Sequence, residues 1–547
     1  MIENKAIKFA TKSAVLDEAH IGDIKGALGT IKHGDIAKRD GWRAKLVTFL
    51  AILGPGLIVM VGDNDAGAFG TYTQAAQNYG TTLLWTLMLL IPVLYVNQEM
   101  VLRLGSVTGV GHARLILERF GKFWGAFSVI DLFLLNALTI VTEFIGISLA
   151  LDYLGLPKTL GVVISAILIM AAASTGNFRK FERFSLILVF GSLLLVPVVI
   201  MVHSPVGQIA HDFIVPQLPK DSKLSEVMLL IIAIVGTTVA PWQLFFQQSY
   251  VIDKRIPARF ISYERIDLWL GIVLVMIGAV AMMAFTAATF AGHPEFGQFT
   301  DAGGVSVGLE KYVGKLPAVL FAIALIDASI IGASAVSLST AYAIGDVFSL
   351  HHSLHRKPKD AKAFYFVYCG LIAIAAALVL TPGTPLGLLT NAVQTLAGVL
   401  LPSATVFLLL LCNDKAVLGP WVNSQKLNLF TGAIVAVLVI LSIILTASVL
   451  WPDIGETTII SILAGGCLLA ASIAVVGWLL RRHQSEQAKP LDKSLRDSWR
   501  MPPLNELPPG RFTTSSRIWM IVLRLYLIVA GGLVMLRIVQ LATGTQG

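Results

Sequence analysis

Long apolar runs recur along the whole 547-residue chain, and they limit the possible folds more than any other feature. A run of about 20 apolar residues is long enough to cross a hydrocarbon core of roughly 30 Å as a helix. The runs lack the alternation of barrel strands, and within lipid only helices and closed barrels satisfy the backbone. Charged residues make up only 14% of the chain, against about a quarter in soluble domains. The sequence therefore predicts an all-α polytopic membrane protein.

Twelve spans are predicted, in a membrane domain that covers residues 46–481. The expected spans are 46–77 (interrupted), 81–102, 123–152, 158–174, 184–203, 225–250 (interrupted), 267–291, 307–344, 363–381, 385–412, 428–451 and 457–480. We expect residues 1–45 to be an N-terminal segment and 482–516 a basic linker. A weaker candidate at 517–541, within the C-terminal part 517–547, is either one more span or an interfacial helix, because it contains Arg524 and Arg537.

Basic residues gather in alternate loops, which predicts the orientation of the chain. The clusters around Lys38–Lys45, Arg114–Lys122, Arg179–Arg183, Lys254–Arg265 and Arg356–Lys362 all fall on one side of the predicted spans. The positive-inside rule places this side, the N-terminus and the linker in the cytoplasm, and we expect the protein in a cell membrane such as a bacterial inner membrane. The net charge of +8 then reflects topology rather than nucleic-acid binding. His351, His352 and His355 lie in one basic loop, and we expect them to be solvated.

The stretch from Gly62 to Gly67, "GDNDAG", interrupts the first span with two carboxylates and two glycines. A charged residue at bilayer depth is costly, so it normally faces a cavity, a partner or a substrate. About 17 apolar or small residues precede the stretch, which places it inside the bilayer. We expect Asp65 to bind substrate. Asp63 either shares this role, shapes the break together with Asn64, or lines the entry route.

A second interruption lies in the sixth span, where Gly236 and Pro241 flank "TTVA". Irregular backbone at membrane depth is tolerated only where it lines a cavity or is buried in protein. Breaks in spans one and six are typical of a LeuT-like 5+5 inverted repeat with discontinuous helices 1 and 6, whose binding site lies at the midplane. The sequence therefore predicts a secondary transporter of this fold.

Other polar residues inside the spans are weaker candidates. Glu143 and Asp327 are intramembrane carboxylates, and Glu143 is expected to lie on an ion path. Asp327 is either a functional group or a packing contact. Gln394 and Asn391, one turn apart in the tenth span, are either ligands or interhelical hydrogen bonders. We see no nucleophile–base pair near Asp65, so an enzyme is not expected.

Several motifs in order resemble the NRAMP divalent-metal transporters over residues 50–480. They are "GPGLIVMVGDNDAGAFGTYTQAAQNYG", "QEMVLRLGSVTGVGHA", "TEFIGISLAL", "NFRKFERF" and "GTTVAPWQLFFQQS". The resemblance implies a LeuT-like fold, divalent cation as substrate and no resident cofactor. It also implies that Asp65 is the charged metal ligand. Backbone carbonyls near Gly62 and Thr237, and the side chains of Thr237 and Gln394, complete or orient the hydrated ion.

Departures from the family pattern concern the metal ligands and the proton-carrying residues. The family's Asn and Met ligands are replaced by Ala68 and Ala240, and its span-six histidines by Trp242 and Gln247. The family's span-three Asp position is Ile140. Without the soft thioether, the remaining oxygen ligands suit hard cations such as Mg²⁺ and Mn²⁺. This pattern resembles the NRAMP-related magnesium transporters, a branch that lacks the Asn and Met.

We therefore expect a transporter for Mg²⁺, with Mn²⁺ also accepted, that works by alternating access without proton coupling. Trp, Gln and Ile cannot carry protons, although Glu143 keeps a proton path open. Two alternatives remain. One is a proton-coupled Mn²⁺/Fe²⁺ importer, and the other is a membrane metal sensor or receptor that binds without transport. Beyond the cation and the lipid bilayer, the sequence indicates no partner.

Overall fold

The computed structural model describes residues 14–220, 222–383, 386–451 and 454–482, together with scattered positions between 496 and 532. Within these ranges the chain is almost entirely helical. Its strands are a short antiparallel hairpin near the N-terminus, in which β1 (Ile24–Lys25) pairs with β2 (Thr30–Ile31). The all-α fold class is confirmed. The predicted linker and the segment 517–547 lie mostly outside the described residues.

The helices have the following bounds in chain order. They are η1 (Glu18–His20), α2 (Trp42–Ile52), α3 (Pro55–Val61), α4 (Ala66–Tyr79), α5 (Trp85–Thr108), α6 (His112–Phe120), α7 (Lys122–Tyr153), α8 (Lys158–Ala173), α9 (Phe178–Gly191), η2 (Ser192–Leu194), α10 (Leu195–Val202), α11 (Val206–Ile214), α12 (Leu224–Thr238), α13 (Pro241–Asp253), η3 (Ala258–Phe260), α14 (Ile261–Phe290), α15 (Ala302–Tyr312), α16 (Lys315–Phe348), α17 (Lys362–Leu380), α18 (Leu386–Cys412), α19 (Lys415–Leu418), η4 (Gly419–Trp421), α20 (Gln425–Leu450), α21 (Glu456–Arg482) and η6 (Leu504–Glu506).

Nine helical segments among the described residues are long and apolar enough to cross a membrane, or up to eleven if each bent pair forms one span. Most predicted spans coincide with these helices. The predicted span 307–344 is wrong at its start. Gly314, at a φ of +136° that other residues rarely adopt, separates α15 from α16, so this span begins at Lys315.

The first predicted span, 46–77, is more interrupted than expected. It bends by 52° between α2 and α3, and it breaks again between α3 and α4. The residues of α3 are all buried, whereas α2 exposes Trp42, Leu46 and Val47. The continuously buried part of this span therefore begins at Ala51, near the end of α2, and the start of α2 lies outside it.

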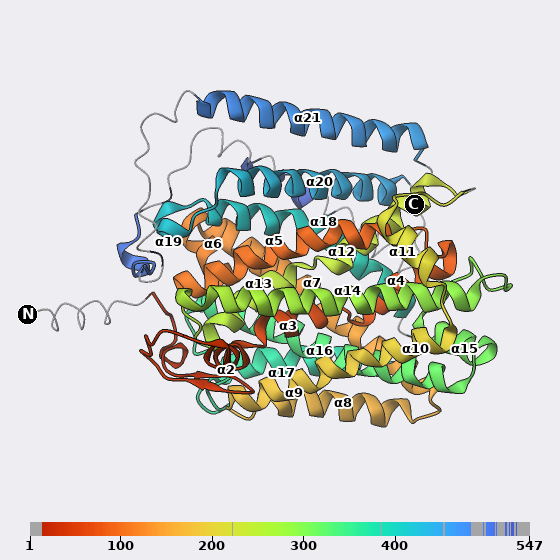
Figure 1. The fold of residues 1–547 in the computed structure, drawn as a ribbon, viewed down its shortest axis with the longest axis horizontal. Helices are drawn as coiled ribbons and strands as arrows, with labels where there is room; N and C mark the ends of the chain where they lie inside the picture. Colours follow the sequence, from red (N-terminus) through yellow and green to blue (C-terminus); the bar gives the residue numbers. More distant parts are fainter. Residues whose placement is uncertain are drawn as a thin grey trace, which may run out of the picture.

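The helices run side by side along the molecule, with α2 and the β-hairpin at one end and α11 and α15 at the other (Figure 1). The centre is formed by α7, which packs along α16, and by α14, which packs along α3, α4 and α5. Helices α20 and α21 lie on one side, and α21 is largely exposed.

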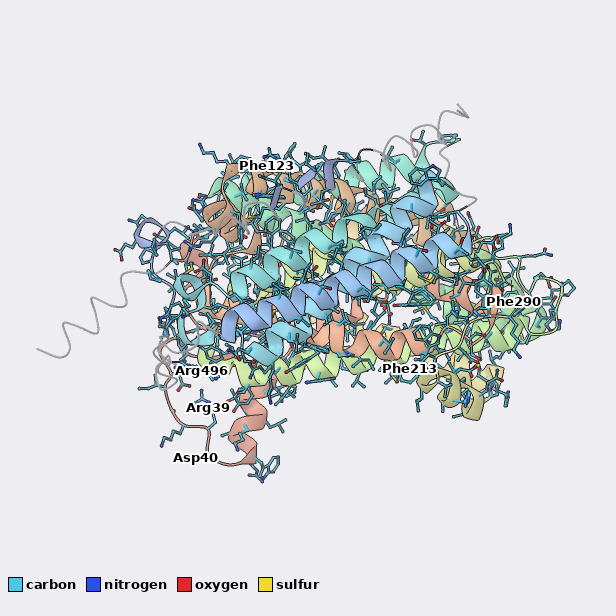
Figure 2. All side chains as sticks on the ribbon, turned by 90° about the horizontal axis from the view of Figure 1, so that it is seen from above. Arg39, Asp40, Phe123, Phe213, Phe290 and Arg496 are labelled. Carbon is cyan, nitrogen blue, oxygen red and sulfur yellow. The ribbon has the colours of Figure 1, made fainter. Side chains whose placement is uncertain are left out.

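Residues 14–41 pack at what we call the N-terminal end of the bundle. Predicted basic loops meet there, because Arg179, Arg255 and Arg356 all donate hydrogen bonds to this segment. Arg39 and Asp40 project at its outer edge (Figure 2). The meeting of these loops at one end agrees with the predicted topology.

Candidate functional site

Asp65 lies at the break between α3 and α4, where it caps the second helix. Its Oδ1 accepts a hydrogen bond of 2.9 Å from the backbone N–H of Ala68. A carboxylate at the N-terminus of a helix satisfies a free N–H group and is stabilised by the helix dipole. The side chain is only 6% exposed. The break therefore fixes a buried carboxylate at a defined point inside the bundle.

Glu143 on α7 meets the same helix start. Its Oε2 accepts a hydrogen bond of 3.1 Å from the backbone N–H of Ala66, and its carboxyl group is also in hydrogen-bond contact with that of Asp65. Glu143 lies against Gly332 on α16, where any side chain would collide with its carboxyl group. The structure thus brings together two carboxyl groups that are 78 residues apart in the sequence (65 and 143).

Asp63 connects the two broken spans. Its Oδ1 accepts a hydrogen bond from Nε2 of Gln243 in α13, and Oε1 of Gln243 accepts one of 2.9 Å from Gln98 on α5. The other oxygen, Oδ2, is buried without a hydrogen-bond partner. These contacts favour the interpretation in which Asp63 shapes the break, and they leave one oxygen available to a ligand.

The predicted break in the sixth span lies between α12, which ends at Thr238, and α13, which begins at Pro241. The last turn of a helix leaves carbonyl groups without intrahelical partners, and here these belong to residues around Thr237. Thr237 itself is buried. The Tyr72 hydroxyl on α4 lies 2.7 Å from Oγ1 of Thr238, which ties the two breaks together a second time.

The other expected site-shaping residues have different surroundings. Asn64 points to α14, where its Nδ2 donates to the carbonyl of Val275 at 3.0 Å. Trp242 is buried, and its ring edge lies next to Gly62. Ala240 is the partly buried residue that precedes α13, and Gln247 is buried with both amide atoms unpartnered.

Several candidates lie apart from the breaks or outside the described side chains. Gln394 and Asn391 lie in α18, but their side chains are outside what the structure describes. Asp327 faces Gly191 at the end of α9, where a side chain would collide with its carboxyl group. Its place against α9, apart from both breaks, gives no support to a ligand role for Asp327.

The expectation that the loop histidines are solvated is wrong for His352. This side chain is buried beneath the N-terminal segment, and its Nε2 lies 3.1 Å from Oδ1 of Asp346. Burial lowers the pKa of His352, but the charge and the hydrogen bond of Asp346 outweigh this and raise it to about 9. The local sequence around His352 does not indicate this burial, because the residues that cover the histidine come from elsewhere in the chain.

The chemistry available at the breaks is that of oxygen ligands. Among the residues that the structure describes, no three His, Cys, Asp or Glu side chains converge to hold a metal ion. A cation at Asp65 would therefore take its other ligands from carbonyl groups, amide oxygens and water. Such ligands are preferred by hard cations.

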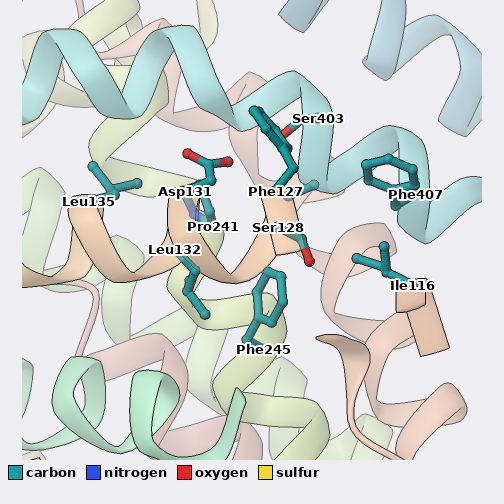
Figure 3. A pocket seen from close by; sticks show the side chains of 11 residues that line it. Ile116, Phe127, Ser128, Asp131, Leu132, Leu135, Pro241, Phe245, Ser403 and Phe407 are labelled. Carbon is teal, nitrogen blue, oxygen red and sulfur yellow. The ribbon is translucent and has the colours of Figure 1, made fainter. Parts of the chain in front are cut away.

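Sequence analysis missed several polar residues near the breaks. The hydrogen bonds described above are completed by Gln243, Gln98 and Tyr72. Only Gln243 had a signal in the sequence, an amide side chain directly after the helix break in "APWQ". Asp131 on α7 was also missed. Its carboxyl group lies between α7 and α18, beside Pro241 and Ser403, in a cavity of about 10 Å³ (Figure 3). Its Oδ1 has no hydrogen-bond partner.

Comparison with known proteins agrees with this geometry. The family model described as natural resistance-associated macrophage protein-like (Nramp) matches residues 56–448, which include the α3–α4 and α12–α13 breaks. The chain belongs to the Nramp family. The divalent metal cation transporter MntH of Ralstonia nicotianae is 31% identical over 422 residues, which cover 73% of this chain and 91% of that protein. The MntH protein of Latilactobacillus sakei is 25% identical over 420 residues.

Several solved structures have a fold similar to that of this chain. The manganese transporter of Eremococcus coleocola, in a mutant form, has a TM-score of 0.62 at 18% identity, covering 85% of this chain and 98% of that one. The same transporter in complex with an aromatic bis-isothiourea compound has a TM-score of 0.61 at 19% identity. The predicted transporter fold is thereby confirmed, and this Nramp protein is a multi-pass integral membrane protein.

Proposed function

We propose that this chain transports divalent metal cations across a membrane by alternating access around its two broken helices. The observation that carries the proposal is the buried carboxylate of Asp65, fixed at the start of α4. Half-helix ends and unwound carbonyls at a midplane break are the ion-binding elements of transporters with inverted repeats. Membership of the Nramp family and relatives named as divalent metal cation transporters support the same function.

Mn²⁺ is the substrate that the comparisons favour over Mg²⁺, because the similar solved structures are of a manganese transporter. The Mg²⁺ expectation has its support in the residues alone. Ala68 and Ala240 supply neither the amide nor the thioether of the family pattern, so oxygen ligands and water remain. Mn²⁺ and Mg²⁺ both accept such ligands. We therefore propose Mn²⁺ as a substrate and Mg²⁺ as a second one, as in the magnesium-transporting branch.

The absence of proton coupling likewise rests on residues, and the comparisons do not support it. Trp242 and Gln247 cannot titrate, whereas Glu143 is a titratable group in contact with Asp65. A membrane potential supplies about 2.3 kcal/mol per charge per 100 mV, which is enough to drive entry of a divalent cation. We propose uncoupled transport, and the proton-coupled Mn²⁺/Fe²⁺ importer is its rival.

Transport by the purified protein in proteoliposomes tests these proposals together. Mn²⁺ and Mg²⁺ uptake are measured separately, with a pH-sensitive dye inside the vesicles and a negative-inside potential. Saturable uptake of both ions without acidification supports the proposal. Mn²⁺ uptake with acidification and without Mg²⁺ uptake supports the proton-coupled importer. Saturable binding without flux of either ion supports the sensor.

A further inference from the structure

The junction between α2 and α3 is held by side chains from two other segments. Nζ of Lys254, directly after α13, donates to the carbonyl groups of Ile52 at 2.6 Å and Leu53 at 2.8 Å. Asp267 on α14 accepts a hydrogen bond of 3.1 Å from the N–H of Gly54. These bonds satisfy backbone groups that the bend leaves without helical partners. The position of the buried helix α3 therefore depends on Lys254.

Lys254 also forms a buried ion pair. Its Nζ lies 2.6 Å from Oε1 of Glu182 on α9, and both side chains are fully buried. Gly54 makes this approach possible, because it has a φ of +150° and any side chain there would collide with the Glu182 carboxylate. A buried ion pair is strongly destabilised when one partner is removed. The pair thus joins α9 to the α2–α3 junction and to the end of α13.

The N-terminal segment 14–35, which we call the latch, binds to the same ion pair. The backbone N–H of Ala27 donates to Oε2 of Glu182 at 2.5 Å. On the neighbouring turns of α9, Arg179 donates to the carbonyl of Gly26 and Arg183 to that of Ala27, both at 2.9 Å. One end of the latch is therefore fixed to α9 around the Glu182 carboxylate.

The other end of the latch is fixed to the loop between α16 and α17. Asp17 is buried and accepts three hydrogen bonds from Arg356, two of 3.0 Å and one of 2.6 Å, and one of 2.9 Å from the N–H of His352. Arg255, just after α13, donates to the carbonyl of Ala19 at 2.9 Å. The latch therefore runs across the end of α13, from α9 at one end to the α16–α17 loop at the other, and both ends are held by hydrogen bonds.

We propose that Lys254 and Glu182 form a gate between the substrate site and the N-terminal end of the bundle. Residues 14–35 are the latch that keeps this gate closed. The inference rests on the proposed function, since alternating access needs an opening on each side of the site. Opening toward the N-terminal end requires α3 to separate from α13 and α9. That movement breaks the bonds of Lys254 to Glu182 and to the α2–α3 junction. It is opposed as long as Ala27 and Asp17 hold the latch in place.

Labelling of a single cysteine tests the gate without any measurement of metal. The reporter is Ala240→Cys at the second break, in a full-length chain whose three native cysteines are replaced. A membrane-impermeant maleimide is added to vesicles from the side of the N-terminus. Asp17→Asn removes the charge that Arg356 binds, and Arg356→Lys, a second variant, removes the paired hydrogen bonds but keeps the charge. Asp40→Asn, at an exposed position next to the latch, is the matched control.

We expect labelling at least fivefold faster in Asp17→Asn or Arg356→Lys than in Asp40→Asn. Thermal unfolding of each variant shows which of them are folded, and the comparison uses those. Equal rates in the folded latch variants and the control would overturn the proposal. Faster labelling of the latch variants, together with a wild type that transports neither Mn²⁺ nor Mg²⁺ in proteoliposomes, would overturn the proposed function and leave the gate in place, so the two failures are distinguishable.

Discussion

The backbone N–H of Ala66 donates a hydrogen bond of 3.1 Å to Oε2 of Glu143, which joins the first turn of α4 to the middle of α7. The same carboxyl group is in hydrogen-bond contact with Asp65. Glu143 therefore anchors the helix start that holds the candidate cation ligand Asp65.

Replacement of Glu143 separates its anchoring role from its charge. Glu143→Ala leaves the Ala66 N–H buried without an acceptor, which costs about 1–3 kcal/mol of unfolding free energy. Glu143→Gln keeps an acceptor oxygen, so we expect a smaller loss of stability. The midpoint of thermal unfolding in detergent measures both. Equal losses in the two variants would mean that the hydrogen bond to Ala66 does not contribute.

The link between the two breaks is tested at Gln243. Gln243→Leu removes the donor to Asp63 and the acceptor for Gln98, so two buried polar groups lose their partners. We expect the free energy of unfolding to fall by about 2 kcal/mol. We also expect metal uptake to fall, by a larger fraction than in the control variant. The matched control is Gln425→Leu at the exposed start of α20. Unchanged uptake in Gln243→Leu would show that the two breaks need not be joined in this way.

Much of this architecture could be predicted from the sequence, because apolar runs, glycines and prolines act locally. The breaks at Gly62–Gly67 and before Pro241 follow from residue types that end helices wherever they occur. The partners of Asp63 and the burial of His352 could not be predicted. They depend on which distant segments pack together, and neither Gln243 nor the latch has a periodic signal that indicates its neighbour. The start of α16 was misplaced for a similar reason, because Gly314 separates two apolar helices that read as one run.

The lost thioether gives a prediction about selectivity. Ala240→Met returns a soft ligand to the residue that precedes α13, and soft ligands favour softer transition metals over Mg²⁺. We expect the affinity for Cd²⁺ to rise about tenfold, or about 1.4 kcal/mol, with no gain for Mg²⁺. Isothermal titration calorimetry with each ion measures this. An equal gain for Mg²⁺, or none for Cd²⁺, would place residue 240 outside the metal's reach.

Stability should depend on pH through His352 in the loop beneath the latch. The charge and hydrogen bond of Asp346 raise the pKa of His352 to about 9 despite burial. Because its pKa is raised on folding, protonated His352 stabilises the folded state fully below about pH 6.5, and this contribution is lost as the pH rises toward 9. The loss is on the order of 3 kcal/mol. Unfolding midpoints between pH 6 and 10 should fall in the wild type and change less in His352→Gln. Parallel curves would exclude His352 as the cause.

The most direct test of the account is divalent cation uptake by Asp65→Asn in proteoliposomes. The matched control is Asp327→Asn, which removes another intramembrane carboxylate that faces α9 instead of the breaks. The account predicts saturable Mn²⁺ uptake in the wild type and in Asp327→Asn, and a loss of at least a hundredfold in Asp65→Asn with the protein still folded. Uptake by Asp65→Asn at the wild-type rate would contradict it, because the buried carboxylate between the broken helices would then not bind the transported ion.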